Sequence, residues 1–279
     1  MARRYELSDH QFALIKDVLS QAKTTRRRRP RRDDRTILNS IFWVLGSGAA
    51  WRDLPERFGP WQTVYDRYRR WSRDGTIDRV LESLQLQLLD DGTLDLETWL
   101  PDSTTVRAQR AAAGAKKKAG TDARTNAAEQ ALGRSRGGLT TKVHLVCDGC
   151  GTPLSVHLSA GKCHDSPQFA PTFEAVTVPA RPKVLVADRG YDRAAIRSYL
   201  SGQGIEPVIP KRRSKAVPEP EPACPVRYRR RNVIERLIGH LKECRRLASR
   251  YEKLARHYLT MVKLACIRRI FKLHFSDTA

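Results

Sequence analysis

The chain has 279 residues, with 52 Lys and Arg against 30 Asp and Glu, and its net charge is +22. A hydrophobic share of 40% excludes disorder throughout, and because no apolar run is long enough for a membrane span or a signal peptide, we expect a cytoplasmic protein. An excess of basic charge this large favours a polyanionic partner, with nucleic acid ahead of acidic membrane.

The first 95 residues are predicted to be helical. Ser8 and Gln11 form a capping-box pattern before apolar residues at helical spacing. Similar periodicity predicts further helices over residues 37–45, 61–71 and 77–89. We expect residues 1–95 to form an all-helical DNA-binding domain of the helix-turn-helix type. The alternative is a plain helix bundle whose arginines face solvent.

Three basic clusters are candidate DNA contacts. The first is an arginine-rich run too charged to pack, the second is the polar face of the third predicted helix, and the third is a Lys-Arg-Arg run. The predicted DNA-binding residues are Arg26, Arg27, Arg28, Arg29, Arg31, Arg32, Arg67, Arg69, Arg70, Lys211, Arg212 and Arg213.

From Thr98 onward the pattern changes to short apolar runs bounded by Gly, Pro and Asp, which favours strands. The predicted strands contain residues 99–101, 143–146, 154–158, 184–187 and 207–209, and the predicted helices cover 168–176, 193–200, 229–247 and 255–275. We expect residues 96–279 to form an α/β domain with a mixed sheet and flanking helices. Within it, residues 108–138 are predicted to be a flexible basic insertion and 211–225 a Pro-rich linker.

The six cysteines all lie in the second half, too few and too uneven for a disulfide scaffold, so we expect reduced thiols. Cys147 and Cys150, followed by Cys163 and His164, have the spacing of a zinc site. The intervening Asp-Gly pair is equally typical of a hairpin turn, and both interpretations stay open.

Two carboxylates lie at or beyond the ends of predicted strands. Asp102 follows the first apolar run and Asp188 ends the run 184–187. Because ligand sites gather outside strand ends in α/β sheets, a pair on neighbouring strands could hold a divalent cation. Taken singly, each is better explained as a cap or turn residue.

A third carboxylate belongs to a helical pattern. Tyr228, Arg231, Glu235 and Lys242 are spaced by three, four and seven residues, so they lie along one line of a helix. Arg231 and Lys242 would counter the charge of a phosphate held near Glu235. The simpler alternative is a surface ion pair between Arg231 and Glu235.

These motifs together resemble the DDE transposases of bacterial insertion sequences, in the insertion sequence four and five groups. The likeness rests on Asp102 in PDSTTV, Asp188 in VADRGYD, the Tyr-Arg-Glu-Lys spacing around Glu235, and WRDLPERFGPWQTVYDRYRRW near the start. It covers nearly the whole chain.

The resemblance implies an RNase H-like fold that cleaves and joins DNA at terminal inverted repeats. It implies two divalent ions per active site, Mg²⁺ with Mn²⁺ as a substitute, held by Asp102, Asp188 and Glu235. Tyr228, Arg231 and Lys242 are then expected to assist catalysis. The expected partners are double-stranded DNA, both inverted repeats and target, and a second copy of the chain in a homodimer. The alternatives are a nuclease of the same fold without strand transfer and a DNA-binding regulator with an inactive catalytic domain.

Overall fold

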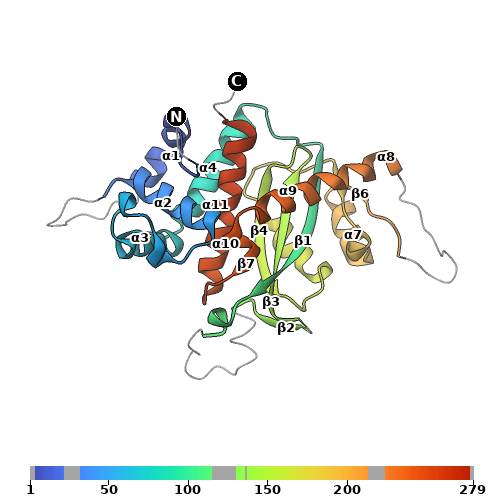
Figure 1. Cartoon of the computed structure of the whole chain (residues 1–279). Helices are drawn as coiled ribbons and strands as arrows, with labels where there is room; N and C mark the ends of the chain where they lie inside the picture. Colours follow the sequence, from blue (N-terminus) through green and yellow to red (C-terminus); the bar gives the residue numbers. More distant parts are fainter. Residues whose placement is uncertain (1–3, 22–31, 115–129, 136, 213–223, 277–279) are drawn as a thin grey trace.

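The computed structural model describes residues 4–21, 32–114, 130–135, 137–212 and 224–276. Its N-terminal region is helical, as predicted (Figure 1). The elements are α1 (Asp9–Gln21), α2 (Asp34–Ser47), α3 (Trp61–Arg73) and α4 (Thr76–Asp90), with the short 3-10 helices η1 (Trp51–Asp53) and η2 (Glu56–Phe58) before α3.

Local capping explains where two of these helices begin and end. The Ser8 N–H donates to Gln11 Oε1 and the Gln11 N–H donates to Ser8 Oγ, both at 3.2 Å, so the predicted capping box is present. Gly48 ends α2 in the left-handed conformation with φ of 74°, which a side chain would strain.

The second part of the chain forms a seven-stranded mixed sheet with helices on it. The strands are β1 (Thr98–Ala108), β2 (Gly133–Ser135), β3 (Gly138–Asp148), β4 (Pro153–Ala160), β5 (Val184–Val186), β6 (Glu206–Val208) and β7 (Ser249–Arg250). The order β4-β3-β1-β5-β6 joins three antiparallel strands to two parallel ones, which is the RNase H-like arrangement. The predicted fold class is therefore confirmed.

Helices and short 3-10 turns complete this part. They are η3 (Arg110–Gly114), η4 (Ser166–Gln168), α6 (Phe169–Glu174), η5 (Arg189–Tyr191), α7 (Ala194–Gly202), α8 (Pro225–Tyr228), η6 (Arg229–Arg231), α9 (Asn232–Lys242), α10 (Arg245–Ala248) and α11 (Ala255–His274). Among the helices that the structure describes, we find none with the length and apolar character needed to cross a bilayer.

The structure differs from the predicted elements in three places. The single helix expected over 229–247 is broken, because Cys244 has an extended backbone between α9 and α10. β1 continues to Ala108, and β2 pairs with β3, so both ends of the expected insertion 108–138 are ordered. Two parts of these predictions lie outside the described residues. They are residues 115–129 and 136 of the expected insertion and residues 213–223 of the expected linker.

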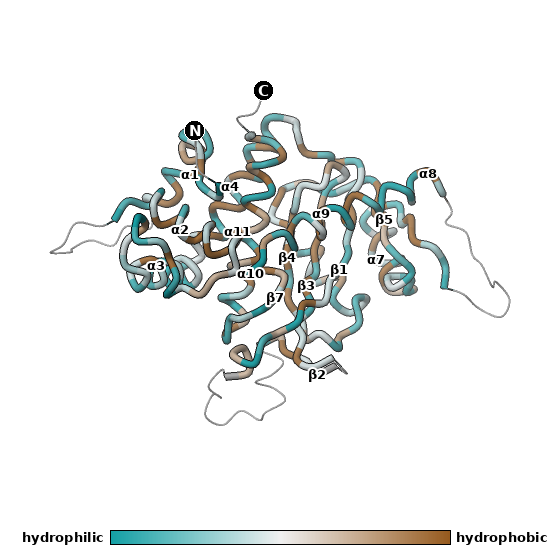
Figure 2. The backbone as a smooth tube through the Cα atoms, in the orientation of Figure 1, coloured by the Kyte–Doolittle hydropathy of each residue, from teal (hydrophilic) through white to brown (hydrophobic). Residues whose placement is uncertain are grey.

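α11 lies between the N-terminal helices and the sheet. Figure 1 shows it running through the middle of the molecule, and it contacts α2, α3, α4, α9, α10 and β4. Figure 2 shows apolar colouring on the strands and along α11 at the centre. The predicted domains 1–95 and 96–279 share one hydrophobic core, which includes Trp71, Trp99 and Met261.

Arg250 is a fully buried cation that joins several segments of this core. Its guanidinium donates to the carbonyls of Gln130 at 2.8 Å, Glu252 at 3.0 Å and Lys253 at 3.2 Å, and to Thr141 Oγ1 at 2.7 Å. Burial lowers the pKa of Arg250 to about 10, so the side chain still carries its charge at neutral pH. The residues that return from the insertion are thereby attached to β3 and to the segment before α11.

We expect Arg250→Met to lower the free energy of unfolding by about 3 to 5 kcal/mol, because several buried carbonyls lose their donor at once. Urea unfolding at neutral pH measures this change. Arg79→Met, at an exposed position on α4, is the control and is expected to cost less than about 1 kcal/mol. A similar loss in both variants would contradict the structural role given to Arg250.

Candidate active site

Strand register brings the first two predicted carboxylates together. β1 and β5 are parallel, with Thr98 opposite Val184 and Trp99 opposite Leu185. The same offset places Asp102, in the middle of β1, opposite Asp188, which follows β5. Asp102 was expected at the end of its strand, but the strand continues beyond it. The two carboxylates also interact electrostatically, because the negative charge of Asp188 acts to raise the pKa of Asp102.

Backbone N–H groups orient both carboxylates. The Ser103 N–H donates to Asp102 Oδ1 at 2.7 Å, and the Gly190 N–H donates to Asp188 Oδ1 at 2.8 Å. A Cβ atom at Gly190 would lie 2.8 Å from the same Asp188 oxygen, so this turn leaves no room for a side chain. The Asp-Arg-Gly sequence after β5 therefore fixes the direction of Asp188.

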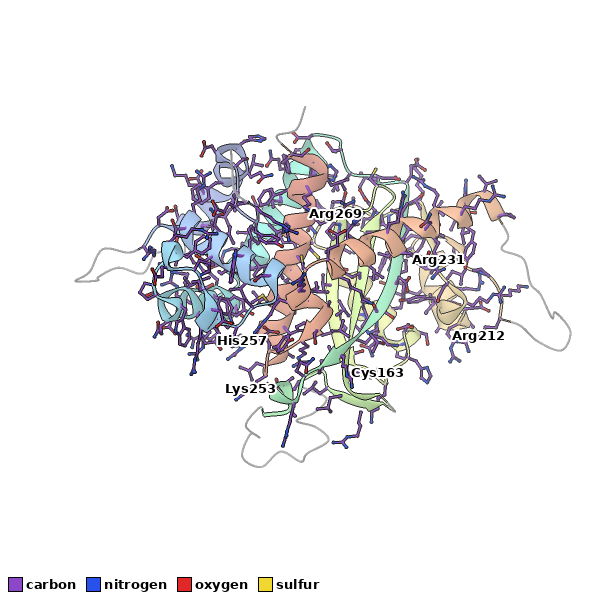
Figure 3. The ribbon with its side chains drawn as sticks, in the orientation of Figure 1. Cys163, Arg212, Arg231, Lys253, His257 and Arg269 are labelled. Carbon is purple, nitrogen blue, oxygen red and sulfur yellow. The ribbon has the colours of Figure 1, made fainter. Side chains whose placement is uncertain are left out.

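Arg231 connects the sheet to the third predicted carboxylate. α9 crosses β1, and Figure 3 labels Arg231 at the start of this crossing. Its Nη2 lies 3.5 Å from Asp102 Oδ2 and its Nη1 lies 2.9 Å from Glu235 Oε1. Burial acts to lower the pKa of Arg231, but the charges of Asp102, Glu235 and Asp188 outweigh burial and raise it.

The three carboxylates differ in exposure. The Asp102 side chain is 15% exposed and that of Glu235 is 51% exposed. Burial raises the pKa of Asp102 to about 6, while the Ser103 N–H and Arg231 act to lower it. Among the described residues, no three His, Cys, Asp or Glu side chains are close enough together to hold a metal ion, and Arg231 contacts both Asp102 and Glu235.

Tyr228 and Lys242 are the other two residues that were predicted to lie along one line of a helix with Arg231 and Glu235. Tyr228, at the end of α8, is partly buried and packs against the hydrophobic core. Lys242 is exposed at the end of α9, two turns beyond Glu235.

Two further polar residues near the carboxylates were not singled out from the sequence. Tyr191 is buried, and burial, then Asp165, Asp102 and Asp188, raise its pKa. Asp165 accepts a hydrogen bond from Ser103 Oγ at 2.6 Å. It also forms an ion pair with Lys142, whose Nζ lies 3.0 Å from Asp165 Oδ1. Asp165 comes shortly after β4 in the sequence. A carboxylate that follows a strand is the same feature that selected Asp102, so this feature could have identified Asp165.

Family models match both parts of the chain. A model described as "Transposase DDE domain" matches residues 98–270, and one described as "Putative transposase of IS4/5 family" matches residues 7–81. The chain belongs to the DDE transposases of the IS4/5 family. The resemblance inferred from the motifs is confirmed.

Relatives of the transposase bear matching names. The "Putative transposase for insertion sequence element IS402" of Burkholderia cepacia is 36% identical over 45% of this chain and 60% of its own length. The "Putative transposase for insertion sequence element IS6501" of Brucella ovis is 33% identical over 46% of this chain and 95% of its own length.

Solved structures of a more distant transposase are also similar. The "Crystal structure of the Mos1 mariner paired end complex with Mn" matches 94% of this chain and 86% of that chain, with 13% identity and a TM-score of 0.30. The "Crystal structure of a pre-cleavage Mos1 transpososome" matches 90% of this chain and 81% of that chain, with 12% identity and a TM-score of 0.26.

The predicted DNA-binding residues of the transposase occupy different environments. Arg26, Arg27, Arg28, Arg29, Arg31 and Arg213 lie outside the described residues, whereas Arg32, Lys211 and Arg212 are exposed. Arg69 is about half exposed, and with Arg67 and Arg70 it lines a cavity of about 360 Å³ on α3. Arg67 itself is buried, forms an ion pair with Asp34, and lies over the Trp71 ring.

Arg212 extends the basic surroundings of the site. Its backbone N–H donates to Asp192 Oδ2 at 2.7 Å, and its guanidinium donates to the carbonyls of Arg189 and Gly190, both at 3.4 Å. Figure 3 labels it on the side of the molecule that also bears Arg231.

The two cysteines with zinc-like spacing flank a turn. β3 and β4 pair as an antiparallel hairpin around Asp148, which confirms the hairpin interpretation. Cys147 is buried in the core whereas Cys150 is exposed, so the two thiols lie in different environments.

We expect Arg231→Met to lower the free energy of unfolding by about 1 to 3 kcal/mol in the presence of a chelator, because Asp102 and Glu235 lose the cation that both contact. Chemical denaturation in EDTA measures it. Arg227→Met breaks an exposed ion pair with Glu206 and is the control, expected to cost about 0 to 1 kcal/mol. Equal effects of the two substitutions would show that Arg231 is an ordinary surface partner.

Proposed function

We propose that the transposase binds the terminal inverted repeats of its insertion sequence, cleaves the DNA there and joins the ends to a target. The observation that carries this proposal is the proximity of Asp102, on β1, to Asp188, which follows the parallel strand β5, with Glu235 tied to Asp102 through Arg231. Phosphodiester chemistry on this site needs no covalent protein nucleophile.

The residues present fit divalent metal ions. Asp102 and Asp188 offer the hard oxygen donors that Mg²⁺ and Mn²⁺ prefer, and their mutual repulsion calls for added positive charge. Arg231 supplies that charge in the present geometry. We propose that Asp102, Asp188 and Glu235 are the ligands, and that Arg231 leaves the carboxylates when the ions bind. When bound, two such ions would activate an attacking oxygen and stabilise a departing one.

The other side chains of the site would act on the DNA. Arg231, released from Asp102 and Glu235, presents a planar guanidinium that matches the oxygens of a phosphate. Tyr228, three residues before it in the chain, would contact the same strand. The N–H groups of Ser103 and Gly190 hold their carboxylates in place before DNA arrives, which reduces the reorganisation needed for reaction.

Double-stranded DNA is the proposed partner along a basic surface. Residues 182–279 contain 23 basic and 9 acidic side chains, and this part of the chain contributes Asp188, Glu235 and Arg212 to the site. We further propose that residues 1–95 recognise the inverted repeat as a helix-turn-helix-like domain and that residues 96–279 catalyse. Since two element ends must meet, a homodimer is the proposed assembly, and its DNA substrate would place it in the bacterial cytoplasm.

We expect Asp102→Asn, Asp188→Asn and Glu235→Gln each to lower nicking of an inverted-repeat duplex by at least about a hundredfold. Mg²⁺-dependent nicking of labelled DNA, with EDTA as a blank, measures activity, and a gel-shift assay should show that DNA binding is retained. Glu206→Gln, at an exposed carboxylate that begins β6 and pairs with the end of β5 opposite to Asp188, is the matched control and should keep full activity. Full activity in any of the three site variants would overturn the assignment.

Strand transfer distinguishes a transposase reaction from simple hydrolysis. We expect the protein, given duplexes that end in a free 3′-hydroxyl at the inverted repeat, to join them to a supercoiled plasmid, because the same centre can accept a hydroxyl in place of water. Joined products on an agarose gel measure this. Nicking of the repeat without joined product would favour a nuclease, and binding with neither reaction would favour a regulator.

A further inference from the structure

An exposed strip of α9 continues beyond the proposed catalytic residues. Arg236, Gly239 and His240 are all exposed on this helix, and Gly239 lies one turn after Glu235. A Cβ atom at Gly239 would meet nothing within 4 Å. A helical glycine costs about 0.5 to 1 kcal/mol relative to alanine, and no neighbouring protein group requires it here. The strip therefore leaves the helix backbone open to close approach from outside.

α11 adds cations beside this strip. Arg268, Arg269 and Lys272 line a cavity of about 30 Å³ together with His240 and Glu243. Glu243 is the one carboxylate among these lining residues and bonds to His240 Nδ1 at 3.2 Å. The cluster thus holds three permanent positive charges against one negative charge.

Arg269 and Arg268 have different surroundings within the cluster. Arg269 Nε is buried and has no hydrogen-bond partner among the described residues, and the pKa of Arg269 is lowered because burial and the nearby Arg236 outweigh the opposing charge of Glu243. Arg268 is held in place, with its guanidinium 4.7 Å from the centre of the Tyr5 ring and its Nη1 3.5 Å from Cys244 Sγ. An anion near Arg269 would relieve the repulsion between these cations.

The cluster is close to the proposed catalytic centre. Gly239 follows Glu235 by four residues, which is about 6 Å along a helix. Figure 3 labels Arg231 and Arg269 toward the two ends of α9. DNA with a phosphate at Arg231 would thus reach the α11 cations within a few base pairs.

We propose that Arg236, Gly239 and His240 of α9, with Arg269 and Lys272 of α11, form a binding track for the sugar–phosphate backbone of the DNA held at the active site. The inference rests on the proposed function. The cations contact phosphates, and Gly239 lets the backbone approach the helix without a steric block. Contacts of this kind are independent of base sequence.

The test compares DNA affinity and its salt dependence. We expect the double variant Arg269→Gln/Lys272→Gln to bind an inverted-repeat duplex about tenfold more weakly, and the slope of log affinity against log salt to fall by about two. A scrambled duplex of equal length should lose affinity by the same factor. The control is Arg181→Gln/Lys183→Gln, which removes two exposed charges at the opposite end of β5 from Asp188.

Gly239→Leu tests the close approach separately. We expect weaker binding of both duplexes with an unchanged or higher thermal midpoint, because leucine favours the helix and meets no protein atoms. Gly202→Leu, at an equally open glycine at the end of α7, should bind DNA like the wild type.

The possible failures are distinguishable. If the wild type nicks the inverted repeat but the double variant keeps its affinity and salt slope, the track is overturned and the proposed function stands. A loss confined to the inverted-repeat duplex would also overturn it, because that result indicates base readout. A wild type that binds neither duplex would overturn the proposed function itself.

Discussion

The burial of α11 is the constraint on which the rest of the structure depends. This helix packs against α2, α3 and α4 on one side and against β4, α9 and α10 on the other. Tyr68 of α3 donates to the His257 carbonyl at the start of α11 at 2.5 Å, so the contact between the two parts is polar as well as apolar. Because α9 and α10 pack on α11, the position of Glu235 over β1 depends on a helix that touches no reacting group.

Charge balance is the second organising feature of the molecule. Asp102 lies partly buried beside Asp188, an arrangement that repulsion and desolvation oppose. Arg231 offsets this cost without metal ions, since it contacts two of the three proposed ligands at once. The same cation would bind phosphate after release. Arg231 therefore stabilises the two carboxylates that it contacts, and in the proposed function it would act on substrate later.

Many elements were predictable because their signals are local. The capping box of Ser8 and Gln11 and the apolar periodicity of α1 to α4 each involve residues within a few positions of one another. The order of strands and helices along the chain followed from short apolar runs and turn residues. The break between α9 and α10 was not predictable, because Cys244 leaves the helix to pack in the core, and the ion pair of Arg246 with Glu252 holds the next turn. Arg67 was placed on a polar face, but tertiary packing pairs it with Asp34.

The sequence by itself determined the helices, the apolar strands and the spacing of Arg231 and Glu235, because these depend on one turn of helix or one short run of residues. Family motifs in the sequence also indicated a DDE transposase. The tertiary structure alone decided that Asp102 and Asp188 share a register, that Arg231 crosses to Asp102 over 129 residues of chain, and that Asp165 and Tyr191 lie behind them. The reason is physical: side-chain neighbours across a sheet are set by strand pairing and helix packing, and no periodicity within the chain records them.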